Sequence, residues 1–187
     1  MNKPAWLTML TVIAAVVLIP ANAGDPVPDN KLRVVIIRHG EKSLTGDNLS
    51  CQGQNRALML PAVLVQKFHV PNHVYVPSIR QKKSESHARM LETVIPLAVK
   101  YDLNINSEFA VDAYADIAAQ VLHKSGTVLM VWEHAGIPAL AAALGVNNPP
   151  AWKTKNFDGI WVITYNDGKA SLSVDRQGLI PPVDCRF

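Results

Sequence analysis

The sequence predicts an α/β protein, a three-layer α/β/α sandwich with a central, mostly parallel sheet. Two almost continuous apolar runs rich in β-branched residues, at 32–37 and 127–132, are typical of strands buried on both faces. Helical patterns lie between and after these runs. Strands that alternate with helices indicate a sheet whose two faces are covered by helices.

A secretory signal is expected ahead of this domain. Lys3 precedes an apolar run from Ala5 to Ile19, and residues 21–23 have the A-x-A pattern of a cleavage site. The run is shorter than the roughly 20 apolar residues of a membrane span. We therefore expect cleavage after Ala23 (signal peptide 1–23) and no stable membrane span afterwards. An uncleaved signal anchor is the alternative.

The rest of the chain is interpreted as a short flexible leader (24–30) and one domain (31–187). Removing the signal leaves 187 − 23 = 164 residues, which suits a single domain with a substantial core. The formal net charge falls from +3 to +2, because Lys3 is the only charge removed. That charge is too small to indicate a nucleic-acid partner, and the 49% hydrophobic content argues against disorder.

In the first half of the domain, the strand at 32–37 leads into a loop rich in Gly, Asn and Ser, and then into a helix at about 54–68. Pro61 predicts a kink or a boundary in that helix. Residues 73–76 predict a short strand. The next helix opens between 84 and 92, and its expected apolar face consists of Met90, Leu91, Ile95, Leu97 and Ala98.

In the second half, residues 113–123 predict a helix and residues 127–132 the second buried strand. Pro138 has the position of a first helical residue, and Gly145 that of a helix C-cap, so a helix is expected between them. The runs 159–165 and 170–174, joined by Asn-Asp-Gly, predict a terminal hairpin.

The two buried strands end at polar pairs, Arg38-His39 and Glu133-His134. Ligands of such sheets bind outside the carboxyl ends of the strands. A histidine can attack phosphorus through one unprotonated ring nitrogen while a backbone carbonyl holds the other N–H. The guanidinium of Arg38 matches the geometry of phosphate oxygens. These residues suit phosphoryl-transfer chemistry, but the tripeptide Arg38-His39-Gly40 taken alone more often ends a strand without any chemical role.

Arg-His-Gly-Glu at residues 38–41, closing an early strand, resembles the signature of the histidine phosphatase superfamily, whose fold is called phosphoglycerate mutase-like. The resemblance extends from about Leu32 to Tyr165. The further matching segments are Leu49-Ser50-x-x-Gly53-x-x-Arg56-Ala57, Arg89-x-x-x-Thr93, the strand 128–134 and Phe157-Asp158-Gly159-Ile160-Trp161. Each motif is common alone, but their order and spacing together are specific.

The resemblance implies that His39 is phosphorylated and then hydrolysed, and that Arg38, Arg89 and His134 surround the phosphoryl oxygens. On this reading His39 is neutral and His134 is preferably charged. Arg80 is an alternative to Arg89, because the serine that the family places shortly before this arginine is eleven residues away, at Ser78. The resemblance implies no cofactor. The other four histidines, His69, His73, His87 and His123, have no ligand-like spacing with a carboxylate or cysteine, so no metal is expected.

A general acid is needed to protonate the leaving group. The sequence leaves three candidates for it, Asp112, Asp116 and Glu133, and we take Asp116 as the first choice. Glu41 is assigned to the substrate-binding set, as a residue that helps to orient the nucleophile loop, although a surface role is equally compatible with the sequence.

The predicted function is hydrolysis of phosphomonoesters through a phosphohistidine on His39. The partner would be a phosphorylated small molecule or sugar phosphate, and the exported protein would be periplasmic or secreted. The alternative is a phosphate- or anion-binding module without turnover. Cys51 and Cys185 either form a disulfide in an oxidising compartment or remain unpaired thiols.

Overall fold

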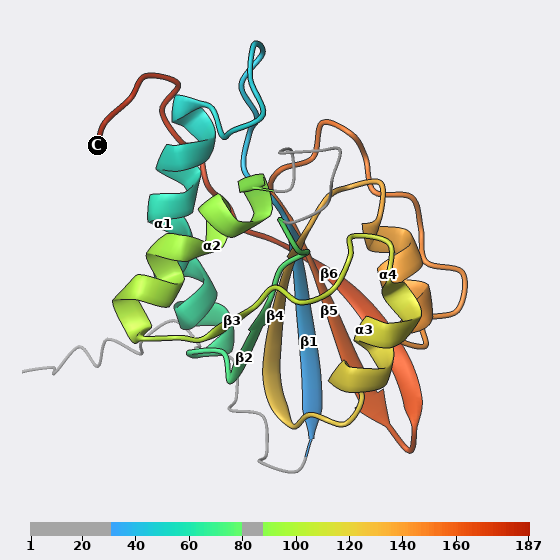
Figure 1. The fold of residues 1–187 in the computed structure, drawn as a ribbon. Helices are drawn as coiled ribbons and strands as arrows, with labels where there is room; N and C mark the ends of the chain where they lie inside the picture. The colour runs from blue at the N-terminus through green and yellow to red at the C-terminus, as the bar shows by residue number, and fades with distance from the viewer. Residues whose placement is uncertain (1–30, 80–87) are drawn as a thin grey trace, which may run out of the picture.

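A six-stranded sheet lies at the centre of the computed structural model, which describes residues 31–79 and 88–187 (Figure 1). The strand order is β3-β2-β4-β1-β5-β6. The first four strands in this order are parallel, and the last two run antiparallel as a hairpin. Their bounds are β1 Leu32–Arg38, β2 His73–Tyr75, β3 Ile105–Asn106, β4 Gly126–Trp132, β5 Gly159–Asn166 and β6 Lys169–Arg176.

Helices cover both faces of this sheet. Figure 1 shows α1 (Cys51–Phe68) and α2 (Ala88–Tyr101) on one face, and α3 (Tyr114–Val121) and α4 (Ile137–Ala143) on the other. Side chains of β1 alternate between two apolar clusters: Val34 and Ile36 pack with residues of α3 and α4, whereas their neighbours Val35 and Ile37 pack with α1 and α2. The predicted three-layer sandwich with a mostly parallel sheet is confirmed.

The predicted elements are present with shifted ends. Helix α1 begins three residues earlier than expected, because the Ser50 side chain caps it and accepts a hydrogen bond from the Gly53 N–H at 3.2 Å. Pro61 lies inside α1 and does not end it. On α2 the expected core position Ile95 is 41% exposed, and Val94 is buried instead. Strand β3 was not predicted, since two residues carry no periodic pattern.

The terminal hairpin follows the prediction closely. Strands β5 and β6 pair from Gly159↔Arg176 to Asn166↔Lys169, which leaves a two-residue turn at Asp167-Gly168. Both turn residues have positive φ, 50° and 74°, as a two-residue hairpin turn with the right twist requires. This antiparallel pair closes the side of the sheet next to β1.

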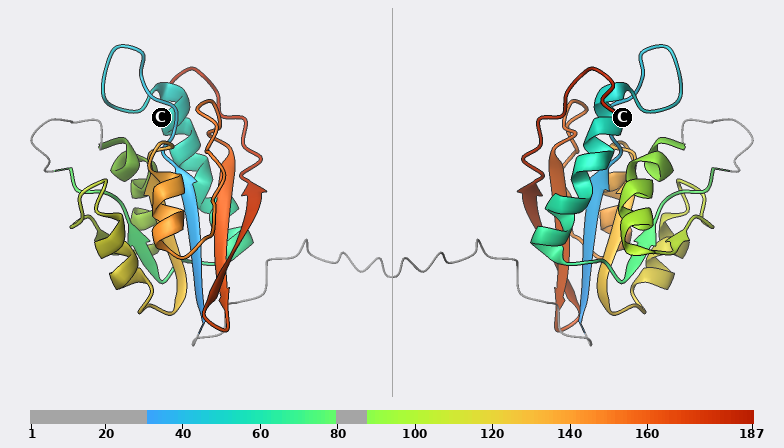
Figure 2. Two further views of the ribbon diagram at one scale, coloured as in Figure 1. Left: turned by 90° about the vertical axis from the view of Figure 1, so that its right-hand side faces the viewer. Right: turned by 90° about the vertical axis from the view of Figure 1, so that its left-hand side faces the viewer.

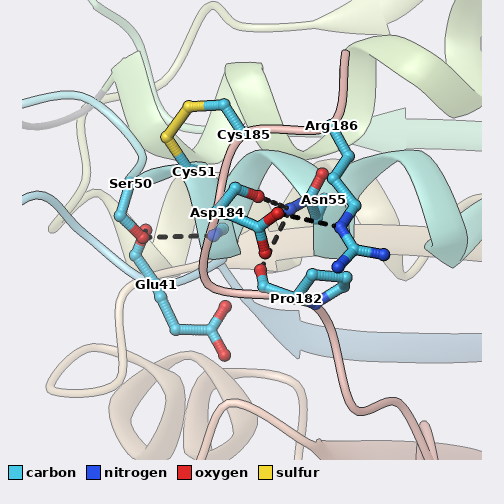
Figure 3. Close-up of a disulfide and its surroundings, with 9 residues drawn as sticks. Glu41, Ser50, Cys51, Asn55, Pro182, Asp184, Cys185 and Arg186 are labelled. Atoms are coloured by element: carbon cyan, nitrogen blue, oxygen red, sulfur yellow. Dashed lines mark hydrogen bonds and ion pairs between the residues drawn. A yellow bond between two sulfur atoms is a disulfide. The ribbon is translucent and has the colours of Figure 1, made fainter.

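Cys51 and Cys185 form a disulfide, which decides between the two alternatives left by the sequence (Figure 3). The bond attaches the C-terminus to the first residue of α1. The loop between β1 and α1 projects from the same end of the molecule (Figure 2).

Some expectations concern residues outside the described ranges: the signal peptide (1–23), the leader (24–30), Arg80 and the first residues expected for the second helix. Within residues 31–79 and 88–187, none of the helices has the length and apolar character needed to span a bilayer.

Candidate functional site

The carboxyl ends of β1 and β4 lie side by side at the centre of the sheet. The two strands are parallel neighbours in register from Leu32↔Gly126 to Arg38↔Trp132. The His39 N–H then donates to the Trp132 carbonyl at 3.0 Å, so the two polar pairs that follow the strands leave the sheet together. Parallel pairing of β1 and β4 therefore brings the two polar pairs to the same end of the sheet.

His39 is held as a neutral imidazole with one free nitrogen. Its Nδ1 lies 2.7 Å from the Gly40 carbonyl oxygen, and because a carbonyl only accepts, Nδ1 must carry the proton. The pKa of His39 is lowered to about 3, chiefly by burial and further by the charges of Arg38, Arg89 and His134, while the hydrogen bond to Gly40 opposes the shift. At neutral pH the ring is therefore uncharged, and the lone pair is on Nε2.

Arg38 is buried beside this ring. Its guanidinium carbon lies 3.8 Å from the centroid of the Phe157 ring, and one of its Nη atoms donates to the Thr154 carbonyl. Burial, and then the charge of Arg89, lower the pKa of Arg38 to about 10, with smaller opposing effects from nearby carboxylates. Arg38 is therefore still a cation at neutral pH, fixed in place by stacking.

Arg89, in the first turn of α2, approaches the same place from another element. Its charge lowers the pKa of both His39 and Arg38. Its Nη1 donates to the Asp47 carbonyl at 2.8 Å, which ties it to the loop between β1 and α1. In the described part of the chain, the Nε atoms of Arg38 and Arg89 are buried without a hydrogen-bond acceptor. Unsatisfied buried donors are costly, so each needs an explanation, and for these two a bound anion would supply the acceptor.

His134 is partly exposed, and in its protonated form it lowers the pKa of His39. Burial lowers the pKa of His134 below its ordinary value, and the charges of Arg38 and Lys42 add to this effect, while Glu133 opposes it. The free protein therefore keeps His134 mostly neutral at pH 7. The sequence-based expectation of a charged His134 does not describe this state.

Glu41 is bonded to Arg56 of α1. Arg56 Nη2 lies 2.7 Å from one carboxylate oxygen of Glu41, and Arg56 Nε lies 3.0 Å from the other. Since both oxygens accept from one guanidinium, this carboxylate supports the loop between β1 and α1, which begins at His39. A direct substrate contact, as in the assignment made from the sequence, would need this ion pair to open.

The three candidate acids occupy different surroundings. Glu133 acts electrostatically on Arg38, His134 and Tyr114. Asp112 acts on Tyr114. Asp116 is exposed in the first turn of α3, and it is not among the charges that shift the pKa values of Arg38, His39 or His134.

Thr93 has a role that sequence reasoning missed. Its hydroxyl donates to the Arg89 carbonyl at 2.7 Å and accepts from the Gly40 N–H at 2.9 Å. It therefore joins α2 to the residue whose carbonyl orients His39. The sequence placed Thr93 in the same motif as Arg89 but gave no sign of this bond.

Phe157 and Thr154, the partners of Arg38, were also missed. Phe157 faces the His39 ring edge-on with centroids 6.2 Å apart. It lies in the segment matched to the family, so a role could have been sought there. The Thr154 contact uses only a backbone carbonyl, which leaves no trace in the sequence.

The site thus gathers two guanidinium groups, a neutral buried imidazole and a second histidine at one end of the sheet. Such a set can hold a dianionic oxyanion and present a ring nitrogen to its central atom. Within residues 31–79 and 88–187, His, Cys, Asp and Glu side chains form no group of three that could hold a metal ion.

No family model matches the chain, and no curated protein matches it by sequence. Solved structures do share its fold. The protein histidine phosphatase SixA complexed with tungstate is similar with a TM-score of 0.53 at 19% identity, covering 78% of this chain and 97% of its own. A phosphoserine phosphatase mutant from Entamoeba histolytica, in complex with phosphoserine, gives 0.52 at 14% identity, covering 79% and 98%.

The α-ribazole phosphatase from Shigella flexneri is similar with a TM-score of 0.51 at 16% identity, covering 76% of this chain and 95% of its own. These structures belong to the histidine phosphatase superfamily. The phosphoglycerate mutase-like fold expected from the sequence is therefore confirmed.

Proposed function

We propose, from the histidine phosphatase fold and the groups gathered around His39, that this chain is a phosphatase that hydrolyses phosphomonoesters through a phosphohistidine on His39. The observation that carries the proposal is the state of that ring. It is buried, neutral and bonded through Nδ1 to Gly40, so Nε2 has the lone pair that attack on phosphorus needs.

In the first step, Nε2 of His39 forms a bond to phosphorus as the bond from phosphorus to the ester oxygen breaks. Arg38 and Arg89 bind the phosphoryl oxygens, and donors fixed in this way are often worth about 2.7–4 kcal/mol each to the transition state. In the second step, water attacks phosphorus, the N–P bond breaks, and inorganic phosphate leaves. Positioning and charge supply most of the catalysis, since the transition state is loose.

Glu133 is our proposed general acid. It would protonate the leaving oxygen in the first step and take a proton from water in the second. Its electrostatic contact with Arg38 and His134 supports this choice over the exposed Asp116, the first choice from the sequence, and over Asp112. Adjacent residues of a strand point to opposite faces, but Glu133 follows β4 and lies in the turn that leads to α4.

His134 would gain its proton when the phosphate arrives. A bound dianion favours the charged imidazolium, so the neutral ring of the free protein would become a donor to a phosphoryl oxygen. With two guanidiniums and an imidazolium around the anion, the proposed mechanism needs no metal ion.

The substrate is proposed to be a phosphorylated small molecule or sugar phosphate, and the protein is proposed to be exported. The disulfide between Cys51 and Cys185 supports an oxidising compartment, such as the periplasm or the extracellular medium. Amino-terminal sequencing of the exported protein should begin at residue 24; an intact signal would instead favour the anchor.

The proposal is tested with the mature protein and an activated aryl phosphate, whose good leaving group barely needs an acid. We expect turnover that survives a chelator, acid-labile phosphate trapped on His39, and a loss of at least about 10³-fold in kcat for His39→Ala. Binding of phosphate without turnover by the native protein would instead identify an anion-binding module, and chelator-sensitive turnover would identify a metal-dependent enzyme.

A further inference from the structure

Arg56 of α1 joins three separate parts of the chain in the interior. It bonds the Glu41 carboxylate through Nε and Nη2, and its Nη1 donates to the Gln177 side-chain oxygen at 2.7 Å. The same Nη1 lies 3.9 Å from the Asp158 carboxylate. Arg56 and Gln177 are each only 4% exposed. A buried guanidinium with this many partners fixes the relative placement of all of them.

The first of these parts is the nucleophile loop, the segment 39–50 between β1 and α1. The first turn of α1 packs closely against it. The Ser50 N–H and hydroxyl both donate to the Glu41 carbonyl, at 2.8 and 3.1 Å. A Cβ on Gly53 would lie 2.2 Å from that same carbonyl oxygen, and one on Gly40 would lie 2.8 Å from the Gly53 oxygen. The carbonyl of Gly40 orients His39, so the position of α1 bears directly on the nucleophile.

The second part is the segment that supports Arg38. Asp158 follows Phe157, on which the Arg38 guanidinium stacks. The Gln177 N–H donates to the Asp158 carbonyl at 2.7 Å, and the Leu179 N–H donates to the Asp158 carboxylate at 3.1 Å. The start of the C-terminal segment (residues 177–187) therefore contacts the support of Arg38.

The third part is the C-terminal segment itself, which α1 holds at two further points (Figure 3). The Asn55 side-chain amide donates to the carbonyls of Pro182 and Asp184, at 2.9 and 2.7 Å. The disulfide from Cys51 to Cys185 then fixes the end of the segment to the first residue of α1. Cys51, Asn55 and Arg56 all lie within the first six residues of α1, so the start of one helix carries all of these contacts.

We propose that the C-terminal segment, closed by the Cys51–Cys185 disulfide, is a positioning element for the reaction of His39, and that Arg56 is the positioning residue through which it acts. Through the Glu41 carboxylate, Arg56 holds the Gly40-Glu41 backbone on one side, and through Asp158 it holds the Phe157-Asp158 support of Arg38 on the other. Reduction of the disulfide releases the segment and lowers turnover. This inference rests on the proposed phosphatase function.

Two measurements test this proposal. Each is made on the mature protein in its oxidised form, in its dithiothreitol-reduced form, and as a Cys51→Ser/Cys185→Ser variant. Steady-state kinetics with an aryl phosphate should give a kcat lowered about 10- to 100-fold by reduction or by the double substitution. The KM should change much less, because a misplaced nucleophile affects the reaction more than binding. Amide hydrogen exchange of Gly40 and Ser50 should accelerate in both altered forms, while the amides of β4 keep their protection.

Arg56→Lys adds a separate test, since lysine keeps the charge but cannot form the fork to Glu41 and Gln177. It should lower kcat like the reduced protein, with a disulfide that is still formed. Lys67→Ala is the matched control. It removes a 2.9 Å ion pair to Asp175 from the same helix, away from the nucleophile loop, and should leave kcat unchanged.

The proposal is overturned if the reduced protein and the double variant keep both the native kcat and the native exchange of Gly40 and Ser50. Failure of the phosphatase function would be recognised separately. The oxidised native protein would then have no turnover at all, while hydrogen exchange would still report whether the segment holds the nucleophile loop.

Discussion

His39 combines two properties that shift its pKa in the same direction: it is buried, and it lies among positively charged side chains. Both properties disfavour the imidazolium, so both lower the pKa and keep the lone pair on Nε2 available. The cations that suit an anionic substrate thus also protect the nucleophile from protonation.

His134 gives the first prediction. The pKa of His134 in the free protein lies below its ordinary value of 6.5, so a reaction that needs its proton should lose kcat/KM, by up to about tenfold per unit, as pH rises from 6.5. The decline of kcat should begin at a higher pH than the decline of kcat/KM, because bound phosphate favours the imidazolium and so raises the pKa of His134. His134→Gln keeps a donor but removes the titration, and should flatten this decline. Identical profiles for both proteins would mean that His134 acts as a neutral group.

Glu133 gives the second prediction. Glu133→Gln should lower kcat about 10²- to 10⁴-fold for an alkyl phosphate and far less for an activated aryl phosphate, because only the poor leaving group needs a proton. Asp116→Asn and Asp112→Asn are the matched controls and should behave like the native protein with both substrates. An alkyl-specific defect in Asp116→Asn would restore the choice made from the sequence.

At the scale of residues, the sequence located the cations and histidines but gave no account of their partners. His39 and His134 were found because they end two apolar strands, and Arg89 because of its motif. The bond from Thr93 to Gly40 and the stacking of Phe157 on Arg38 join segments far apart in the chain. No local pattern encodes such contacts. They depend on how α2 and the residues just before β5 pack against the end of β1.

At the scale of elements, the first turn of α1 is shaped by the nucleophile loop. Gly53 is a helical residue, and alanine there would normally favour the helix by up to about 1 kcal/mol. The structure instead predicts that alanine at position 53 lowers stability. The added Cβ would lie 2.2 Å from the Glu41 carbonyl oxygen and 2.8 Å from the Glu41 nitrogen, both of them backbone atoms.

Gly53→Ala should therefore destabilise the protein by at least about 1–3 kcal/mol in urea unfolding, as overpacking does elsewhere. It should also lower kcat by displacing the loop that carries His39. Gly46→Ala serves as the control, since its new Cβ would come no nearer than 3.9 Å to the Ser43 side chain. Native stability and turnover in Gly53→Ala would show that the loop yields easily.

The same contact explains why helix ends were harder to predict than helices. The interior of α1 follows from its apolar pattern, whereas its start at Cys51 depends on Ser50, which caps the helix and bonds Glu41 at once. For α2 the expected face included Ile95, which is 41% exposed, because the helix turns Val94 toward the core. Packing against α1 and the sheet sets that rotation.

At the scale of the whole molecule, alternation of strands and helices was enough to predict the layers, because each strand must bury both faces. The strand order was not predictable in the same way. Strand β1 is central only because β5 returns antiparallel along one side of it while β4 pairs along the other. That order depends on the terminal hairpin, whose turn could be predicted from the sequence but whose pairing with β1 could not.

The disulfide was also beyond prediction, since a sequence cannot give the separation of two cysteines 134 residues apart. Its position follows from the fold as a whole. The C-terminal segment leaves β6, contacts the Asp158 region, and reaches the first turn of α1, where the nucleophile loop ends. The end of the molecule that carries His39 is therefore also the end where the disulfide joins the two parts of the chain.

The burial of His39 should make the stability of the whole molecule depend on pH. The pKa of His39 is about 3 in the folded protein and near 6.5 when the chain unfolds, so between these values the unfolded state binds a proton that the folded state excludes. The contribution of His39 to the free energy of unfolding is therefore full above pH 6.5. It is lost as the pH falls toward 3, by roughly 1.4 kcal/mol per pH unit.

His39→Asn removes this titration. Between pH 7 and 5 the native protein should lose about 2 kcal/mol more unfolding free energy than the variant, measured by urea denaturation of the oxidised proteins. Every other titrating group is common to both proteins and largely cancels in the difference. Equal losses would mean that His39 binds its proton as readily in the folded protein as in the unfolded chain, and would refute the lowering of its pKa by burial and by the neighbouring arginines.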